Sequence, residues 1–189
     1  MFPGKESLKK ESSRPRPDLS PGQFESFVGL VADYIRAQRA HYFRRAVPMT
    51  FTELWSRFFS PADLARMRVL QPGLERVPNP PFYSALEKLG FTELIDFSTM
   101  AAITFDDLVV FHDPLTPQLI FHELVHVVQY RLLGIDEFAR LYVRGYLHGG
   151  YEGTPLEVCA YQLDGRFIMG SVGFDVEAEV QAWIEGGRF

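Results

Sequence analysis

Residues 117–134 read PQLIFHELVHVVQYRLLG, an apolar run that contains the pentad HELVH at positions 122–126. On an α-helix, histidines four residues apart lie about one turn apart on the same face, so both imidazoles can reach a single cation. Glu123 lies about 100° further round the helix, which leaves its carboxylate beside that cation rather than on it. The pentad therefore predicts that His122 and His126 bind a zinc ion and that Glu123 is the general base for a zinc-bound water.

The residues around the pentad favour a metal site over a pair of solvent-exposed histidines. The segment is apolar nearly all round the predicted helix, as expected of a helix in the centre of a domain. Burying two imidazoles and a carboxylate there without partners is costly, and a metal ion removes that cost. Two alternatives remain: the pentad is a chance occurrence, or its histidines are core and surface residues that bind no metal.

The expected bounds of this helix place both histidines in its interior. Thr116 can cap the start, with Pro117 at the first helical position. Gly134 suits the left-handed residue just past the end, and Asp136 then reads as the cap of a further helix.

A catalytic zinc ion usually has three protein ligands, so a third ligand is expected downstream of the pentad. Gln129 and Leu132 stand where the metzincin class requires glycine and histidine, which excludes that class. Glutamate is the next ligand type, and three glutamates compete for the role: Glu137, Glu152 and Glu157.

The three glutamates lie in different local contexts. Glu137 is expected in the first turn of a helix, where it interacts with the helix dipole, and Glu152 lies in a glycine-rich loop that would hold a ligand poorly. Glu157 opens a helix predicted over residues 154–161, from which it could reach the metal. Thr154-x-x-Glu157 is also a capping box, in which Glu157 would have only a capping role. We expect Glu157 as the third ligand, with Glu152 as the alternative.

The motif HELVHVVQ, the Tyr- and Gly-rich loop downstream and the segment PLEVCAY resemble the minimal gluzincin metallopeptidases. The likeness is closest to compact bacterial domains with the motif H-E-x-x-H-x-x-Q, and it covers residues 111–167. It implies a zinc-dependent metallopeptidase that hydrolyses peptide bonds. It also implies that His122, His126 and Glu157 are the metal ligands and that Glu123 is the base.

One position departs from the gluzincin pattern. Better-studied gluzincins carry N-E-x-x-x-D around the last ligand, whereas this chain has LEVCAY. The usual outer aspartate is therefore absent at its spacing, and Asp164 is only a weak substitute. Gln129, seven residues after His122, returns to the histidine face, where it can hydrogen-bond a ligand residue or the substrate.

The loop at residues 146–151 offers three donors for a developing oxyanion: Tyr146, His148 and Tyr151. Spacing does not decide among them. We favour Tyr151 as a catalytic residue because it lies nearest to the predicted ligand helix.

The composition is that of a single enzyme domain. With 189 residues, of which 47% are hydrophobic and 14% aromatic, the chain can bury a sizeable core. The formal charge of -5 and the lack of a patterned basic helix indicate neither nucleic acid nor a membrane as a partner, and we expect a peptide or protein substrate. The one cysteine, Cys159, is expected to be a buried structural thiol.

Residues 1–22 are polar and rich in Lys, Ser and Pro, so they are expected to form a disordered tail before a single zincin-like domain over residues 23–189. The sequence has no signal-peptide core and no apolar run of about 18 residues. The cytoplasm is therefore the default location, although export by a route that reads no N-terminal signal is compatible with the sequence.

Upstream of the pentad, residues 23–89 are expected to form helices, with the aromatic residues of 51–59 in the core. Residues 102–105 and 108–111 flank two aspartates and predict a β-hairpin. In zincin folds an edge strand at this place binds the substrate peptide; the alternative is a hairpin that only covers the core. His112 is either a substrate contact or a loop histidine.

These features together predict an α+β domain, mostly helical with a small antiparallel sheet or hairpin before the metal helix. The predicted function is a zinc-dependent peptidase with one zinc ion per chain. The main alternative is a non-catalytic zinc-binding interaction domain of the same fold, and the intact Glu123 favours the enzyme. A helical scaffold without metal is the third possibility.

Overall fold

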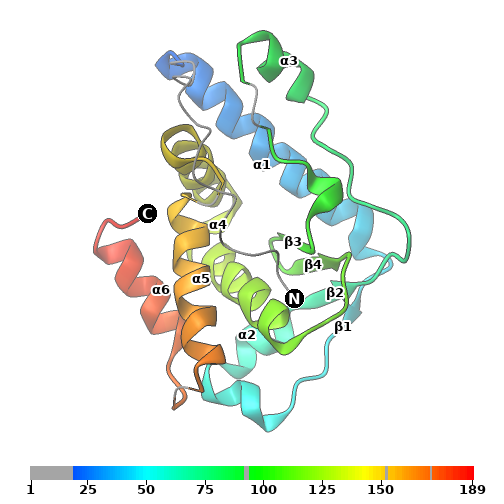
Figure 1. Ribbon diagram of the computed structural model, residues 1–189, viewed down its shortest axis with the longest axis vertical. Helices are drawn as coiled ribbons and strands as arrows, with labels where there is room; N and C mark the ends of the chain where they lie inside the picture. The colour runs from blue at the N-terminus through cyan, green and yellow to red at the C-terminus, as the bar shows by residue number, and fades with distance from the viewer. Residues whose placement is uncertain (1–18, 92–93, 152, 171) are drawn as a thin grey trace, which may run out of the picture.

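The helix α4 (Pro117–Gly149) runs through the middle of the molecule (Figure 1). The computed structural model describes residues 19–91, 94–151, 153–170 and 172–189. The other helices are, in chain order, α1 (Pro21–Phe43), η1 (Glu53–Arg57), α2 (Pro61–Arg66), α3 (Tyr83–Lys88), η2 (Phe97–Thr99), α5 (Pro155–Ile168) and α6 (Val176–Glu185), of which η1 and η2 are 3-10 helices. Helices α5 and α1 make the most extensive contacts with α4.

The sheet has four strands in the order β1-β2-β4-β3, namely β1 (Val47–Pro48), β2 (Arg68–Leu70), β3 (Ala102–Phe105) and β4 (Leu108–Phe111). Strands β3 and β4 form the predicted antiparallel hairpin. Strand β2 pairs with β4 in parallel, so the sheet is mixed and the prediction of an antiparallel sheet is wrong. Strand β2 could not be predicted from the sequence, because a strand of three residues is too short to show an alternating pattern. The structure therefore shows an α+β chain, mostly helical, with a small mixed sheet.

Helix α4 is interrupted at Gly134, where the sequence predicts the end of the pentad helix. The φ of 74° and ψ of 165° at Gly134 are not helical, and a second helical piece follows. The predicted cap is also confirmed: Thr116 Oγ1 accepts a hydrogen bond of 3.2 Å from the N–H of Leu119. The pentad consequently lies well inside the first piece of α4.

Helix α1 begins at Pro21 because Ser20 caps it. Ser20 Oγ accepts a hydrogen bond from the N–H of Gln23, and the Gln23 side chain accepts one from the N–H of Ser20. Residues 21 and 22 therefore belong to the helix rather than to the polar segment predicted over residues 1–22. Residues 1–18 of that segment lie outside the described part of the chain.

Two apolar clusters pack against α4. One joins α1, α3, the sheet and the second piece of α4, and the other joins η1, the first piece of α4, α5 and α6. Trp55, Phe58 and Phe59 are buried in the second cluster, which confirms their predicted role in the core. Cys159 is buried there as predicted, and burial raises the pKa of its thiol to about 12. Within the described residues, no helix combines the length and the apolarity needed to cross a membrane.

Candidate metal centre

Helices α4 and α5 lie side by side and bring three of the predicted residues together (Figure 1). The Nε2 atoms of His122 and His126 are 3.2 Å apart. Glu157, from the first turn of α5, places Oε2 at 3.3 Å from His122 Nε2 and Oε1 at 3.5 Å from His126 Nε2. All three residues are buried, and their ligand atoms lie within 4.8 Å of one another. This group could hold a metal ion.

The outer nitrogen of each imidazole is held by a neighbouring side chain. His122 Nδ1 lies 3.0 Å from Asp164 Oδ2, and His126 Nδ1 lies 2.8 Å from Gln129 Oε1. Gln129 is itself oriented by its amide, which donates a hydrogen bond of 3.0 Å to the carbonyl of Leu156. Because Asp164 and Gln129 each accept a hydrogen bond from an Nδ1–H group, the Nε2 atom of each imidazole is directed at the centre of the cluster.

The donor atoms fit a cation. Glu157 Oε2 is fully buried and has no hydrogen-bond partner among the described residues, although His122 Nε2 is near it. A buried carboxylate oxygen without a partner is rare, because the charge loses its hydration. A metal ion between the two imidazoles and this carboxylate would satisfy Oε2 and both Nε2 lone pairs at once.

Protons compete with a metal for this cluster. Burial alone lowers the pKa of His122, but the hydrogen bond with Asp164 and the nearby carboxylate of Glu157 outweigh burial and raise the pKa to about 10. Burial likewise opposes the charge on Glu157, but the two imidazoles beside it hold the pKa of Glu157 well below its usual range. A metal ion that binds near neutral pH would therefore displace at least one proton from the histidines.

The structure distinguishes the two roles weighed for Glu157. Thr154 makes no side-chain cap to α5; its hydroxyl donates to the carbonyl of Tyr151 instead, so the predicted capping box does not form. The carboxylate of Glu157 faces the histidines. Glu137 is not in the cluster: its side chain is 47% exposed and lies 3.5 Å from Arg140. Glu152, the alternative ligand, lies outside the described residues.

Glu123 is buried beside the cluster and faces the sheet. Its Oε2 accepts a hydrogen bond of 2.6 Å from Thr104 Oγ1, on strand β3. Sequence reasoning missed Thr104, because all four residues of β3 are buried and no alternation marks the one that meets the helix. Asp164 was also undervalued, since its contact with His122 depends on how α5 lies on α4 rather than on the expected spacing.

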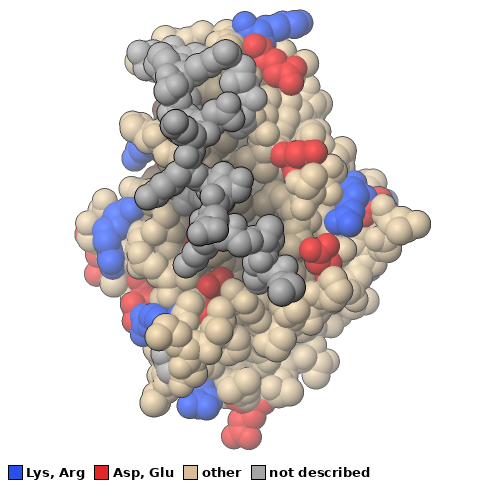
Figure 2. Space-filling model, in the orientation of Figure 1, with Lys and Arg blue, Asp and Glu red and all other residues tan. Residues whose placement is uncertain are grey.

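A groove of about 590 Å³ leads to the cluster. His122, Glu123 and Asp164 line its floor, while the segment before β3 and the loop between β4 and α4 form its walls. Apart from His122, the ionisable residues Asp96, Asp113, Glu123 and Asp164 in its described lining are all acidic, and the lining has no Lys or Arg. Figure 2 shows acidic side chains spread over this face, with Lys and Arg mostly at the periphery.

The three candidate oxyanion donors are placed differently. Tyr151 lines the groove together with Glu123, and burial raises the pKa of its hydroxyl well above the usual range. Tyr146 is buried among apolar residues of an adjoining cavity. His148 is exposed, and its Nδ1 lies 2.7 Å from the carbonyl of Arg144. Of the three, only Tyr151 lies where the groove meets Glu123; its catalytic role stays a prediction.

His112 contacts the backbone of neighbouring segments and is not among the residues that line the groove. Its Nε2 accepts a hydrogen bond of 3.1 Å from the N–H of Val77, and its Nδ1 lies 2.9 Å from the carbonyl of Met100. With both ring nitrogens engaged, His112 fits the loop role better than the role of a substrate contact.

The comparisons with known proteins found no protein-family model, no curated protein and no solved structure that matches this chain.

Proposed function

We propose that this protein is a zinc-dependent metallopeptidase of gluzincin type. The observation that carries the proposal is the buried convergence of His122, His126 and Glu157, with Glu123 beside them and a groove leading in. Two imidazoles and one carboxylate form a ligand set typical of catalytic zinc, which keeps a further position open. A purely structural zinc site would more often be closed by a fourth protein ligand.

The chemistry proposed for the site is hydrolysis of a peptide bond. Bound zinc supplies the Lewis acidity that activates water and polarises the scissile carbonyl. Glu123 accepts the proton of the attacking water as the C–O bond forms, and it passes that proton to the amine as the C–N bond breaks. Tyr151 remains a protonated donor for the oxyanion, because burial keeps the pKa of its hydroxyl high.

The position of β3 supports a peptide as the substrate. In the described sheet β3 is an edge strand, and its first residue, Ala102, lines the groove with Met100 and Ala101. An extended chain can pair with such an edge through main-chain hydrogen bonds. Thr104, on the same strand, donates a hydrogen bond to Glu123, so a peptide bound along β3 would lie beside the base.

Metal analysis and peptide cleavage test the proposal together. The purified protein should carry about one zinc ion per chain and cleave members of an unbiased peptide library. Glu123→Gln should keep the zinc but lose turnover by about a thousandfold, because an amide cannot accept the proton of water. Glu137→Gln is the matched control, since Glu137 is exposed on the same helix, and it should behave as wild type.

Each negative result has its own meaning. Protein that neither carries nor takes up zinc would refute the metal site. Protein that binds zinc at His122, His126 and Glu157 but cleaves no peptide would favour the zinc-binding interaction domain instead.

A further inference from the structure

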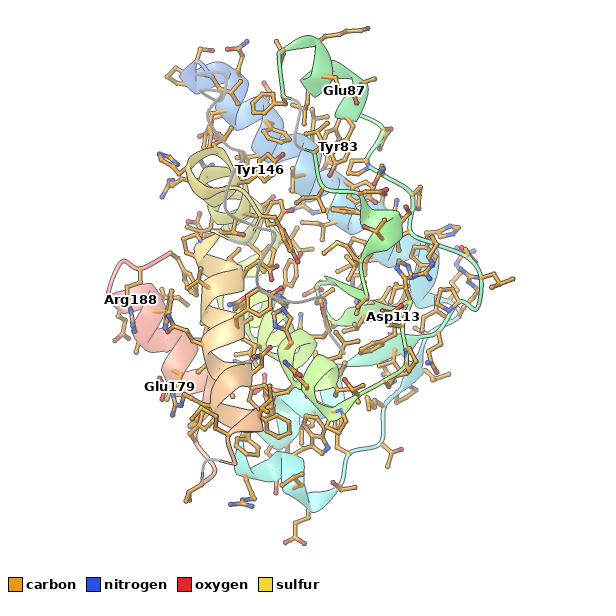
Figure 3. All side chains as sticks on the ribbon, in the orientation of Figure 1. Tyr83, Glu87, Asp113, Tyr146, Glu179 and Arg188 are labelled. Carbon is orange, nitrogen blue, oxygen red and sulfur yellow. The ribbon has the colours of Figure 1, made fainter. Side chains whose placement is uncertain are left out.

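Helix α5 begins against the second piece of α4, and Gly145 lies where the two helices meet. Gly145 is buried within α4. Figure 3 shows Tyr146, the next residue, on the second piece of α4, above the end of α5 at which that helix begins. Glycine is a poorer helix former than alanine, so a buried glycine inside a helix calls for a packing reason.

A side chain at position 145 would have no room. A Cβ atom added to Gly145 would lie 2.6 Å from Pro155 Cδ and 2.7 Å from Thr154 Cγ2. It would also lie 3.0 Å from the Cα atom of Thr154. Carbon atoms in contact are about 3.5–4.0 Å apart, so an added methyl group would push the start of α5 away by roughly 1 Å.

Neither neighbour of Gly145 can yield by itself. Pro155 Cδ belongs to a ring that is closed on the backbone nitrogen, so it moves only with the chain. Thr154 is fully buried, and both its N–H, at 3.0 Å, and its hydroxyl donate a hydrogen bond to the carbonyl of Tyr151. Rotation of the Thr154 side chain would break the hydroxyl bond. Room for a methyl group must therefore come from a movement of the two helices.

The start of α5 carries the carboxylate of the candidate metal centre. Glu157 is two residues after Pro155, and its oxygens lie 3.3 and 3.5 Å from the imidazole Nε2 atoms of the cluster. On the side of the first piece of α4, the Gln129 amide holds the carbonyl of Leu156 at 3.0 Å. Metal–ligand distances vary by only about 0.2 Å in a sound site. A movement of roughly 1 Å at Pro155 is several times that tolerance.

We propose that Gly145 is a positioning residue of the metal centre: its lack of a side chain lets α5 approach α4 closely enough for Glu157 to complete the ligand set. The inference rests on the proposed function, because it concerns the same metal ion. It assigns part of the metal affinity to a residue that lies outside the pentad and supplies no ligand atom.

Zinc affinity, measured by competition with a chelator, tests the inference without a cleavage assay. Gly145→Ala should weaken zinc binding by about 10- to 100-fold, as is usual when the support of a ligand is lost. The effect is smaller than loss of the ligand, because rotation within the Glu157 side chain recovers part of the movement. Gly149→Ala is the matched control. It lies one turn further on in α4, is exposed, and its added Cβ would meet no described atom of another segment within 4 Å.

Two further measurements separate positioning from a general loss of packing. Cobalt accepts the same ligands as zinc, and its visible absorption depends on their number and geometry. Gly145→Ala should change the spectrum of the cobalt-loaded protein, whereas Gly149→Ala should not. The triple variant Gly145→Ala/Thr154→Ser/Pro155→Ala removes the two closest carbon atoms and keeps a hydroxyl at position 154. Its zinc affinity should return to within about threefold of that of Thr154→Ser/Pro155→Ala.

A second comparison applies if Gly145→Ala does not fold. Gly145→Ala/Pro155→Ala keeps the close contact with Thr154 Cγ2, so it should bind zinc more weakly than the triple variant. Equal affinities of these two proteins would overturn the inference.

The outcomes distinguish this inference from the proposed function. Wild-type zinc affinity in Gly145→Ala, or a loss that the triple variant does not recover, would overturn the inference and leave the peptidase proposal standing. The expected losses, in a protein whose wild type cleaves no peptide, would overturn the peptidase proposal alone. A wild type that takes up no metal would overturn both.

Discussion

Two buried polar clusters contact α4, and they balance their negative charge in different ways. Asp63, fully buried in α2, lies 2.6 Å from Arg131 Nε, and Arg131 also contacts Glu177 at 2.8 Å. Glu157 is also buried but faces two imidazoles, and in the described part of the chain no Lys or Arg pairs with it.

The two clusters differ in the source of the positive charge that compensates their buried carboxylate. A buried carboxylate is stable only when a positive group compensates it. In the Asp63 cluster the chain itself supplies a permanent guanidinium. In the Glu157 cluster compensation comes from protons on the histidines or from a metal ion, so only this cluster is suited to bind a cation reversibly.

The largest expected effect is on metal affinity. Glu157→Gln should weaken zinc binding by about a thousandfold, because a neutral amide oxygen replaces one of the three protein donors. Competition with a chelator of known affinity measures the change. Glu137→Gln should bind zinc as wild type does, and an unchanged affinity in Glu157→Gln would mean that the ligand set is wrong.

In the Asp63 cluster we expect a mutation to change the stability of the protein and not its zinc affinity. Arg131→Met should destabilise the protein by about 3 kcal/mol, the lower part of the range for breaking a buried pair, because the guanidinium is partly exposed. Zinc affinity should not change. Urea unfolding of the metal-free protein gives the stability, and the double variant with Asp63→Asn should recover part of the loss. A change of zinc affinity in Arg131→Met would show that the clusters are coupled.

Proton release should distinguish the metal cluster further. Since the pKa of His122 is raised from 6.5 to about 10, zinc must displace a proton below pH 10, and zinc affinity should rise with pH through this window. In the metal-free protein, the same shift stabilises the fold fully below pH 6.5, and this contribution is lost as the pH rises towards 10. Calorimetry in two buffers with different ionisation enthalpies counts the protons released.

Asp164→Asn is the variant that tests this explanation. It removes the carboxylate that holds the proton on His122, so fewer protons should be released near pH 8. Zinc affinity should fall by about 10- to 100-fold, as is usual when an outer partner of a ligand is lost. Proton release identical to that of the wild type would contradict the role given to Asp164.

The smallest effect is expected at the contact between β3 and Glu123. Thr104→Val should lower kcat about fivefold with little change in KM, because one hydrogen bond that orients Glu123, the proposed base, is lost. Thr104→Ser keeps the hydroxyl and should restore kcat. A variant Thr104→Val with wild-type kcat would mean that packing alone orients Glu123.

The secondary structure around the pentad could be predicted from short stretches of sequence. The end of the first piece of α4 at Gly134, the cap at Thr116 and the hairpin of β3 and β4 all follow from a few neighbouring residues. Such features depend on backbone preferences and on the period of apolar residues, and neighbouring residues in the sequence determine both. The parallel strand β2 has no such period and could not be predicted.

The pentad alone places His122, Glu123 and His126 on one apolar helix, which defines the kind of chemistry to look for. The identity of the acids that complete the cluster, in contrast, depends on how the helices pack. Glu157 and Asp164 reach the histidines because α5 packs along α4, and that packing depends on apolar contacts among residues far apart in the chain. The same holds for Thr104 and for the cavity beside Tyr146, whose walls come from separate elements and exist only once these have assembled.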